Sequence, residues 1–330
     1  MTHRFSLAAQ RGLSLIELLV AMAIGLIVVG VGASSYINVV TNSRTANVLG
    51  QMTENASIAL GIIRAQVALA GYSRPVGVVK TNETVGGVVT EVNRMNRAYT
   101  GIATAGGTNN FIVGCDRGFT SNTAHELNIS QLTCATPGAG VSESDAIAVV
   151  YEADTSNTFP TAAGAPTDCL GDTLPVRTEA TLQANPVRLA SNKFYIQNNN
   201  LMCLGNGRDL TTNPLPPTPN DTISGAPQPL VENIYDLQIR YGVAAINTTT
   251  GNPNREAIAY LTASDINSIA GTDRWNRVVS AQICIEVRSS TNVPSNEQTT
   301  YLNCQGNVVA SPAGQLARTF STTVVLHNRI

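Results

Sequence analysis

The segment that most constrains this chain is the apolar run Leu13–Ala33, which contains one charged residue, Glu17. A helix of about 20 apolar residues spans a hydrocarbon core of roughly 30 Å, so this run is long enough to cross a membrane. An acid at membrane depth costs on the order of 2.5–3.5 kcal/mol, so a partner that offsets this cost is expected. No basic residue inside the run can be that partner.

The residues before the run set its orientation. They include the basic residues Arg4 and Arg11 and no acid, so the N-terminus is expected in the cytoplasm and everything after Ala33 outside it. A cleaved secretory signal peptide is an alternative, because "GVGASS" offers small residues for cleavage. We favour an uncleaved anchor or a more specialised signal, because the run is longer than a typical signal core and the helical pattern continues beyond it.

A glycine and an acid mark the start of the run: Gly12 precedes Leu13, and Glu17 follows. This arrangement resembles the class III signal of type IV prepilins. The resemblance implies that a prepilin peptidase cuts between Gly12 and Leu13 and methylates the new amine, which makes residues 1–12 a leader peptide. It also implies that Glu17 pairs with the Leu13 amine of a neighbouring subunit in a filament. The alternative is that Glu17 is an interfacial acid on an ordinary anchor and Gly12 a chance glycine.

Beyond the membrane run, apolar residues recur every three or four positions, which is typical of an amphipathic helix. These residues are Leu49, Met52, Ala56, Ala59, Ile63, Val67 and Ala70. Gly71 is a suitable end for the helix, and no proline precedes it within the run. We therefore expect one helix with a transmembrane or filament-core half at 13–36 and an amphipathic half at 37–71. An anchor joined to an unrelated helix stays possible because glycines interrupt the pattern.

Residues 72–330 change to Gly, Asn, Thr and Ser with short β-branched runs, which predicts a β-rich periplasmic or extracellular head. Alternation is clearest in "YDLQIRYGV" and "VVSAQICIEVRS" and predicts half-buried antiparallel strands. The expected fold class is α+β, a long N-terminal helix packed on an antiparallel sheet. Candidate strands begin at Phe111, Asp145, Asn192, Tyr235, Val278 and Thr319.

The six cysteines all follow the membrane run, and an even number in an exported head favours disulfides. Six cysteines allow fifteen pairings, but loop-closure entropy favours sequence neighbours. The alternative is that some of the six cysteines are free buried thiols. The favoured pairs are Cys115 with Cys134, Cys169 with Cys203, and Cys284 with Cys304.

The sequence contains no motif for catalysis or for a cofactor. Phosphate-binding GxxxxGK[ST], GxSxG and HExxH patterns are absent, and neither His125 nor His327 lies in a motif. Asp154, Asp168 and Asp172 lack EF-hand spacing, so no metal site is predicted. The formal net charge is −2, and no basic stripe indicates nucleic-acid binding. We predict a protein that is not an enzyme and that has no cofactor.

Four stretches resemble PilW-type minor pilins, in order along the chain. They are "QMTENASIALGIIRAQVALAGYSRPVG", "LVENIYDLQIRYGV", "RWNRVVSAQICIEVRSS" and "RTFSTTVVLHNRI". The resemblance implies a minor pilin of a priming or tip complex that starts pilus assembly. It implies an inner-membrane location with a periplasmic head before assembly, and a place at the extracellular pilus tip afterwards.

The partners implied by this resemblance are other minor pilins, the major pilin, the prepilin peptidase and the inner-membrane assembly platform. A tip adhesin is a further candidate. The nearest alternative is a J-type pseudopilin of type II secretion, which has a similar helix. A membrane-anchored periplasmic binding protein with a fortuitous N-terminus is an alternative from a different class.

The processing signal yields a first prediction. The mature chain should begin at methylated Leu13, and replacing Gly12 with a bulky residue should leave the precursor uncut and filaments scarce. Mass spectrometry of the N-terminal peptide measures both. A mature N-terminus near Ser34 would contradict the prepilin interpretation.

Overall fold

The computed structural model describes most of the chain as two compact units, residues 1–50 and 51–330, which we treat separately. The N-terminal stretch that includes Gly12 and Leu13 lies outside the described residues. The described residues are 14–85, 88–97, 110–120, 127–136, 143–177, 186–208, 225–246, 253–271, 274–291, 293 and 300–329.

One α-helix, α1 (Leu15–Ala68), begins in the first unit and ends in the second. It is continuous through its glycines, as the absence of proline predicts. By length and composition it can cross a membrane, since its most apolar 18-residue window has a mean hydropathy of 2.6. The expected boundaries at residues 12, 36 and 71 stay predictions.

Within the second unit, the predicted apolar stripe of α1 forms part of the core. Its members Met52, Ala56, Ala59, Ile63, Val67 and Ala70 are each at most 2% exposed. Gly71 then adopts a left-handed conformation (φ 74°), which is the usual way for a helix to end at glycine. Its amide donates to the Val150 carbonyl at 2.9 Å, so the chain leaves the helix directly against a strand.

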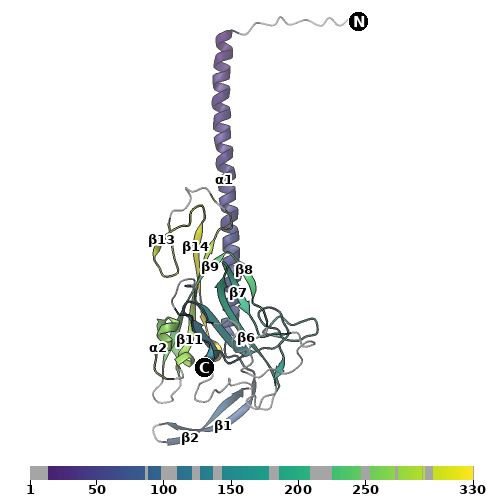
Figure 1. Cartoon of the computed structure of the whole chain (residues 1–330), viewed down its shortest axis with the longest axis vertical. Helices are drawn as coiled ribbons and strands as arrows, with labels where there is room; N and C mark the ends of the chain where they lie inside the picture. Colours follow the sequence, from purple (N-terminus) through teal and green to yellow (C-terminus); the bar gives the residue numbers. More distant parts are fainter. Residues whose placement is uncertain are drawn as a thin grey trace, which may run out of the picture. The chain divides into compact units, whose positions relative to one another are not determined.

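A six-stranded antiparallel sheet covers one side of this helical segment (Figure 1). Five strands follow the order β3-β4-β6-β7-β8, and β5 pairs with β6. Their bounds are β3 (Ile112–Cys115), β4 (Ala146–Glu152), β5 (Val176–Arg177), β6 (Val187–Gln197), β7 (Asn200–Leu204) and β8 (Gln228–Glu232).

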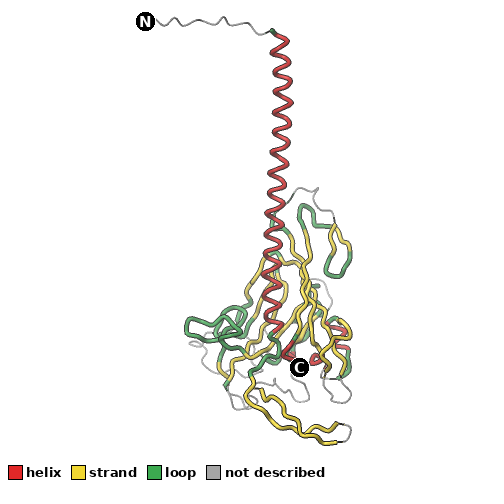
Figure 2. Tube along the Cα trace, turned by 180° about the vertical axis from the view of Figure 1, so that it is seen from behind, coloured by secondary structure: helices red, strands yellow, loops and turns green. Residues whose placement is uncertain are grey.

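A four-stranded antiparallel sheet has the order β10-β9-β11-β14, and Figure 2 shows it from behind. Its strands are β9 (Ile234–Ile246), β10 (Pro253–Leu261), β11 (Val278–Arg288) and β14 (Ala317–Val325). Two hairpins complete the described strands: β1 (Pro75–Val85) with β2 (Val88–Arg97), and β12 (Thr300–Leu302) with β13 (Val308–Ala310). The short α2 (Ala263–Ser268) follows β10, and 3₁₀ turns lie at Ile129–Gln131, Arg274–Arg277 and His327–Arg329.

Asparagines in left-handed conformations make two of the sharpest turns. Asn198 and Asn199 have φ values of 51° and 60° and connect β6 to β7 as a two-residue hairpin loop. Asn233, with φ 63°, is the single residue between β8 and β9. It therefore redirects the chain from the six-stranded sheet to the four-stranded one, a role for which asparagine is well suited.

The alternation read from the sequence is confirmed in β9 and β11. Leu237, Ile239 and Tyr241 of β9 are at most 1% exposed, and the corresponding β11 residues are fully buried. Tyr235, which the pattern placed on the same face, is only half-buried and lies 4.3 Å below the Arg288 guanidinium. The ring of Tyr241 packs edge-on against Trp275, with centroids 5.0 Å apart.

Asp145, just before β4, joins the two sheets. Its amide donates to the Leu237 carbonyl at 2.7 Å, and its carboxylate accepts from the Ile239 amide at 2.7 Å. Burial, with a smaller contribution from the nearby Asp116 and Asp236 carboxylates, raises the pKa of Asp145 to about 8 although the backbone hydrogen bond from Ile239 opposes the shift. The carboxyl group is therefore largely protonated at neutral pH.

This raised pKa predicts a pH-dependent stability. From about pH 4 to about pH 8 the folded protein keeps a proton that the unfolded chain releases, so the free energy of unfolding should fall as the pH rises through this range. The slope from this group is at most about 1.4 kcal/mol per pH unit. Asp145→Asn keeps an acceptor for the Ile239 amide and should remove this contribution.

Denaturant unfolding of the full-length protein in detergent at several pH values measures the slope. Glu54→Gln, on the exposed face of α1, is the control and should keep the wild-type slope. The same slope in Asp145→Asn would show that Asp145 does not hold the proton.

Candidate assembly interface

Glu17 lies in the first turn of α1, where the helix opens at Ser14. The amides of Glu17 and Leu18 both donate to the Ser14 carbonyl, at 3.0 and 3.2 Å. A carboxylate in a first turn is stabilised by the positive end of the helix dipole. That effect is smaller than the cost of burying an acid in hydrocarbon, so a nearby cation would stabilise an ionised Glu17.

The helix around Glu17 exposes apolar side chains on all its sides within the first unit. Every residue of the most apolar window is exposed in the single chain. A surface this apolar is stable only in lipid or against other protein surfaces. The large exposed side chains are Leu15, Ile16, Leu18, Leu19, Val20, Met22, Ile24, Leu26, Ile27, Val28, Val29 and Val31, followed by Tyr36, Ile37 and Val39.

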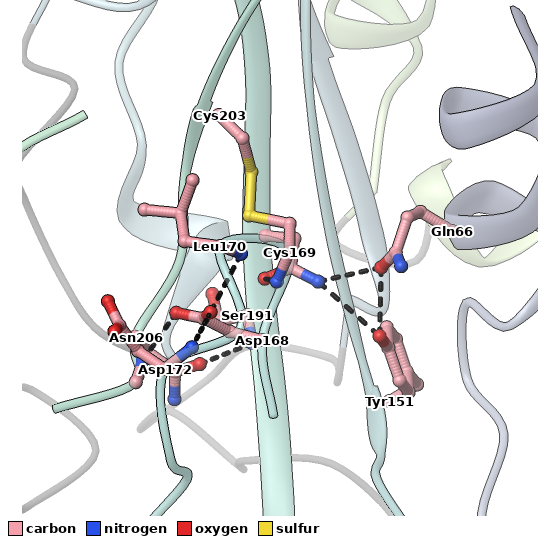
Figure 3. Close-up of a disulfide and its surroundings, with 11 residues drawn as sticks. Gln66, Tyr151, Asp168, Cys169, Leu170, Asp172, Ser191, Cys203 and Asn206 are labelled. Carbon is pink, nitrogen blue, oxygen red and sulfur yellow. Dashed lines mark hydrogen bonds between the residues drawn. A yellow bond between two sulfur atoms is a disulfide. The ribbon is translucent and has the colours of Figure 1, made fainter. Parts of the chain in front are cut away.

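A buried polar cluster fixes the head to the last turns of α1 (Figure 3). The Gln66 side-chain oxygen accepts from the Tyr151 hydroxyl at 2.8 Å and from the Asn192 amide at 2.7 Å. Burial raises the pKa of Tyr151, so its hydroxyl stays protonated and can donate. Asn192 also accepts from the Cys169 amide at 3.2 Å, so the cluster connects the helix to a disulfide.

A second contact holds the chain immediately after the helix. The buried Glu152 carboxylate accepts from the Ser73 hydroxyl at 2.7 Å and from the Arg74 amide at 2.8 Å. It also forms an ion pair with the Arg74 side chain at 3.1 Å. Neither Glu152 nor the Gln66 cluster was predicted from the sequence. The available signal was a polar residue, Gln66, between the buried stripe positions Ile63 and Val67.

The structure joins the six cysteines as neighbours in sequence. The pairs are Cys115–Cys134, Cys169–Cys203 and Cys284–Cys304. Asp168 orders the loop beside Cys169, because its carboxylate accepts from the Leu170 amide at 2.8 Å and from the Gly207 amide at 2.7 Å (Figure 3).

The other residues considered from the sequence have local structural roles or are not described. Asp154 accepts from the Ser156 hydroxyl and amide in a tight turn. Among the described residues, no three His, Cys, Asp or Glu side chains gather as a metal site. His125, like Gly12 and Leu13, lies outside the described residues.

Comparison with known families gives two matches, one to a short N-terminal motif and one to a family of whole proteins. The prokaryotic N-terminal methylation motif matches residues 7–33, a range that contains Gly12, Leu13 and Glu17. The family of type IV pilus-assembly protein W, PilW, matches residues 193–328, from β6 to the C-terminal turn. A solved type IV-like pilin from Thermus thermophilus is 8% identical, with a TM-score of 0.30 over 84% of this chain and 97% of that chain. No curated protein matches the chain.

The methylation motif, the apolar helix and the antiparallel head define a type IV pilin-like protein with the expected α+β fold. The match of its C-terminal part identifies it further. Residues 193–328 resemble the PilW family, and this match and the methylation motif together support a type IV minor pilin of the PilW type.

The Gln66 cluster predicts a measurable loss of stability. Gln66→Ala removes the acceptor for Tyr151 and Asn192, and leaving buried donors unsatisfied costs about 1–3 kcal/mol. Thermal and denaturant unfolding of the full-length protein in detergent measures the change. Arg64→Ala, at an exposed position on the same helix, is the control and should change stability by less than about 0.5 kcal/mol. Equal effects of the two substitutions would contradict a role for the cluster.

Proposed function

We propose that this minor pilin belongs to the complex that initiates a type IV pilus and remains at its tip. The single observation that carries the proposal is Glu17, one acid in an exposed apolar helix. The helix gives Glu17 no cation of its own within the described residues. The processed amine of a neighbouring subunit would provide one, so the acid selects a docked position over an isolated one.

The electrostatics of this pair determine where a subunit can dock. In hydrocarbon, either charge alone is strongly unfavourable, and the pair is stable only when both members meet. A helix that slides along its neighbour would separate the charges, so the pair sets the stagger between subunits. The remaining contacts between such helices are apolar and would tolerate several registers.

The size of the head supports a position at a filament end. A compact domain of about 260 residues has a radius of gyration near 18 Å, which is bulky for a unit repeated along a thin shaft. One copy at the tip avoids this crowding. Because Glu17 is retained, we place the subunit below the outermost position, where another subunit can contribute its amine.

The proposed partners follow from this position. Before assembly, the protein would be anchored in the inner membrane with its head in the periplasm and would meet the prepilin peptidase and the assembly platform. After assembly, it would contact other minor pilins and the major pilin, with a tip adhesin as a further candidate. No nucleic-acid contact and no enzymatic activity are included in the proposal.

Glu17→Ala tests this function. The substitution should leave membrane insertion intact or improve it, because it removes a costly charge. Incorporation should fall, because the neighbouring amine loses its partner in apolar surroundings. The measurement compares the protein in membranes and in sheared pili, in a strain that lacks the native copy.

Two further variants sharpen this comparison. Glu17→Gln keeps the size of the side chain but not its charge, and should behave as Glu17→Ala. Ser34→Ala is the control, because the Ser34 hydroxyl donates within its own helix to the Val31 carbonyl at 2.9 Å. Equal incorporation of wild type and both Glu17 variants would show that the acid does not guide docking.

A further inference from the structure

A polar trough of about 490 Å³ crosses the solvent-facing side of the four-stranded sheet. Its floor consists of side chains that alternate with the buried residues of β9 and β11. Gln238 and Arg240 come from β9, Gln282 from β11 and Ser321 from β14. The volume lies within the range of small-ligand sites, roughly 300–1,000 Å³.

Both walls of the trough are held rigidly. One wall is the turn after β3, where the Asp116 carboxylate accepts from the Ala263 and Ser264 amides at 3.0 and 3.1 Å. The neighbouring Cys115 is bonded to Cys134. Such bracing reduces the ordering cost of binding a ligand.

The opposite wall is the turn between β12 and β13. Its first residue, Asn303, accepts from the Gln305 and Asn307 amides at 3.2 and 2.8 Å. The disulfide Cys284–Cys304 ties this turn to the floor of the trough. Two of the three disulfides in the head therefore support the same trough.

The lining offers hydrogen-bond donors and acceptors in near balance. Arg117, Arg240 and Glu143 line the trough, and their side chains make no hydrogen bond or ion pair within the described residues. The lining thus contains two arginines, Arg117 and Arg240, and two further acids, Glu143 and Asp116. Burial raises the pKa of Asp145, the third acid of the lining, so at neutral pH it adds little charge.

This chemistry discriminates between ligand classes. Among the described residues of the lining, Ile239 is the only one with an aliphatic side chain, and it is 1% exposed, so these residues offer little aliphatic surface to a peptide side chain. The trough also lies across a sheet face and not along an edge, so a peptide could not add a strand there. Hydroxyl groups both donate and accept, and they match a lining of amides, guanidinium groups and a carboxylate.

We propose that this trough binds a hydroxyl-rich saccharide chain. Arg240 and Glu143 would contact adjacent hydroxyl groups, and the Gln282 side-chain amide would bind others from the floor. The Gln238 amide nitrogen already donates to the Glu143 carbonyl and the Asp236 carboxylate, both at 3.1 Å, so Gln238 would offer its side-chain oxygen as an acceptor. The balanced charge favours neutral saccharides over strongly anionic ones. This binding activity is separate from docking through Glu17, so it can fail or succeed independently of the proposed role in assembly.

The test uses the full-length protein in detergent and saturation-transfer difference NMR. The probes are cellohexaose and chitohexaose as neutral chains, hexagalacturonate as an anionic chain, and an uncharged peptide rich in Ser, Thr and Gln. Saturation transfer to the ring protons of a neutral chain is expected. Absence of transfer to every saccharide, or transfer to the peptide alone, would overturn the proposal.

Variants place the binding in the trough. Arg240→Ala should weaken binding roughly tenfold, the effect expected for the loss of a hydrogen bond to a charged group. Ser321→Trp should fill the trough and abolish binding, while Arg318→Ala, exposed on β14 outside the lining, should leave it unchanged. Unfolding curves establish that each variant folds, and Gln282→Ala replaces any that does not. Equal binding by wild type and the trough variants would overturn the assignment.

Discussion

The head depends on the burial of one stripe of α1. Met52, Ile63 and Val67 each contribute about 1.5–3 kcal/mol of hydrophobic stabilisation if they exchange water for the core. The same helix begins as a segment that is apolar on every side and suits lipid. One continuous helix is therefore suited to two environments. Its residue pattern changes from apolar on every side to a single apolar stripe where the head begins.

The periodic elements could be predicted from the sequence because burial on one face leaves a regular pattern. The stripe of the helix and the strands β9 and β11 were found in this way, and the other candidate strands were found from short β-branched runs. Other strands, among them β8 and β1, could not be predicted. β8 contains Pro229 and one buried residue, and β1 reads "PVGVVKTNETV" with several polar positions. Such strands are specified by their neighbours more than by their own composition.

The candidate site could be predicted from the sequence only in part, for a related reason. Glu17 could be recognised because a single charge in an apolar run is anomalous by itself. Gln66 could not, because its partners Tyr151 and Asn192 lie 85 and 126 positions away in the chain. The trough could not be predicted for the same reason, because residues as far apart in the sequence as Asp116 and Gln305 come together only after the sheets have formed.

The three disulfides also have a mechanical consequence. They join residues 19, 34 and 20 positions apart, so each loop is bypassed when the chain is pulled. A free stretch of 20 residues spans at most about 66–72 Å when fully extended. Tension along the chain is therefore transmitted through the disulfide bonds, and the bypassed loops add no length when the surrounding head unfolds. The bonds limit how far the protein can be stretched, whatever they contribute to its folding.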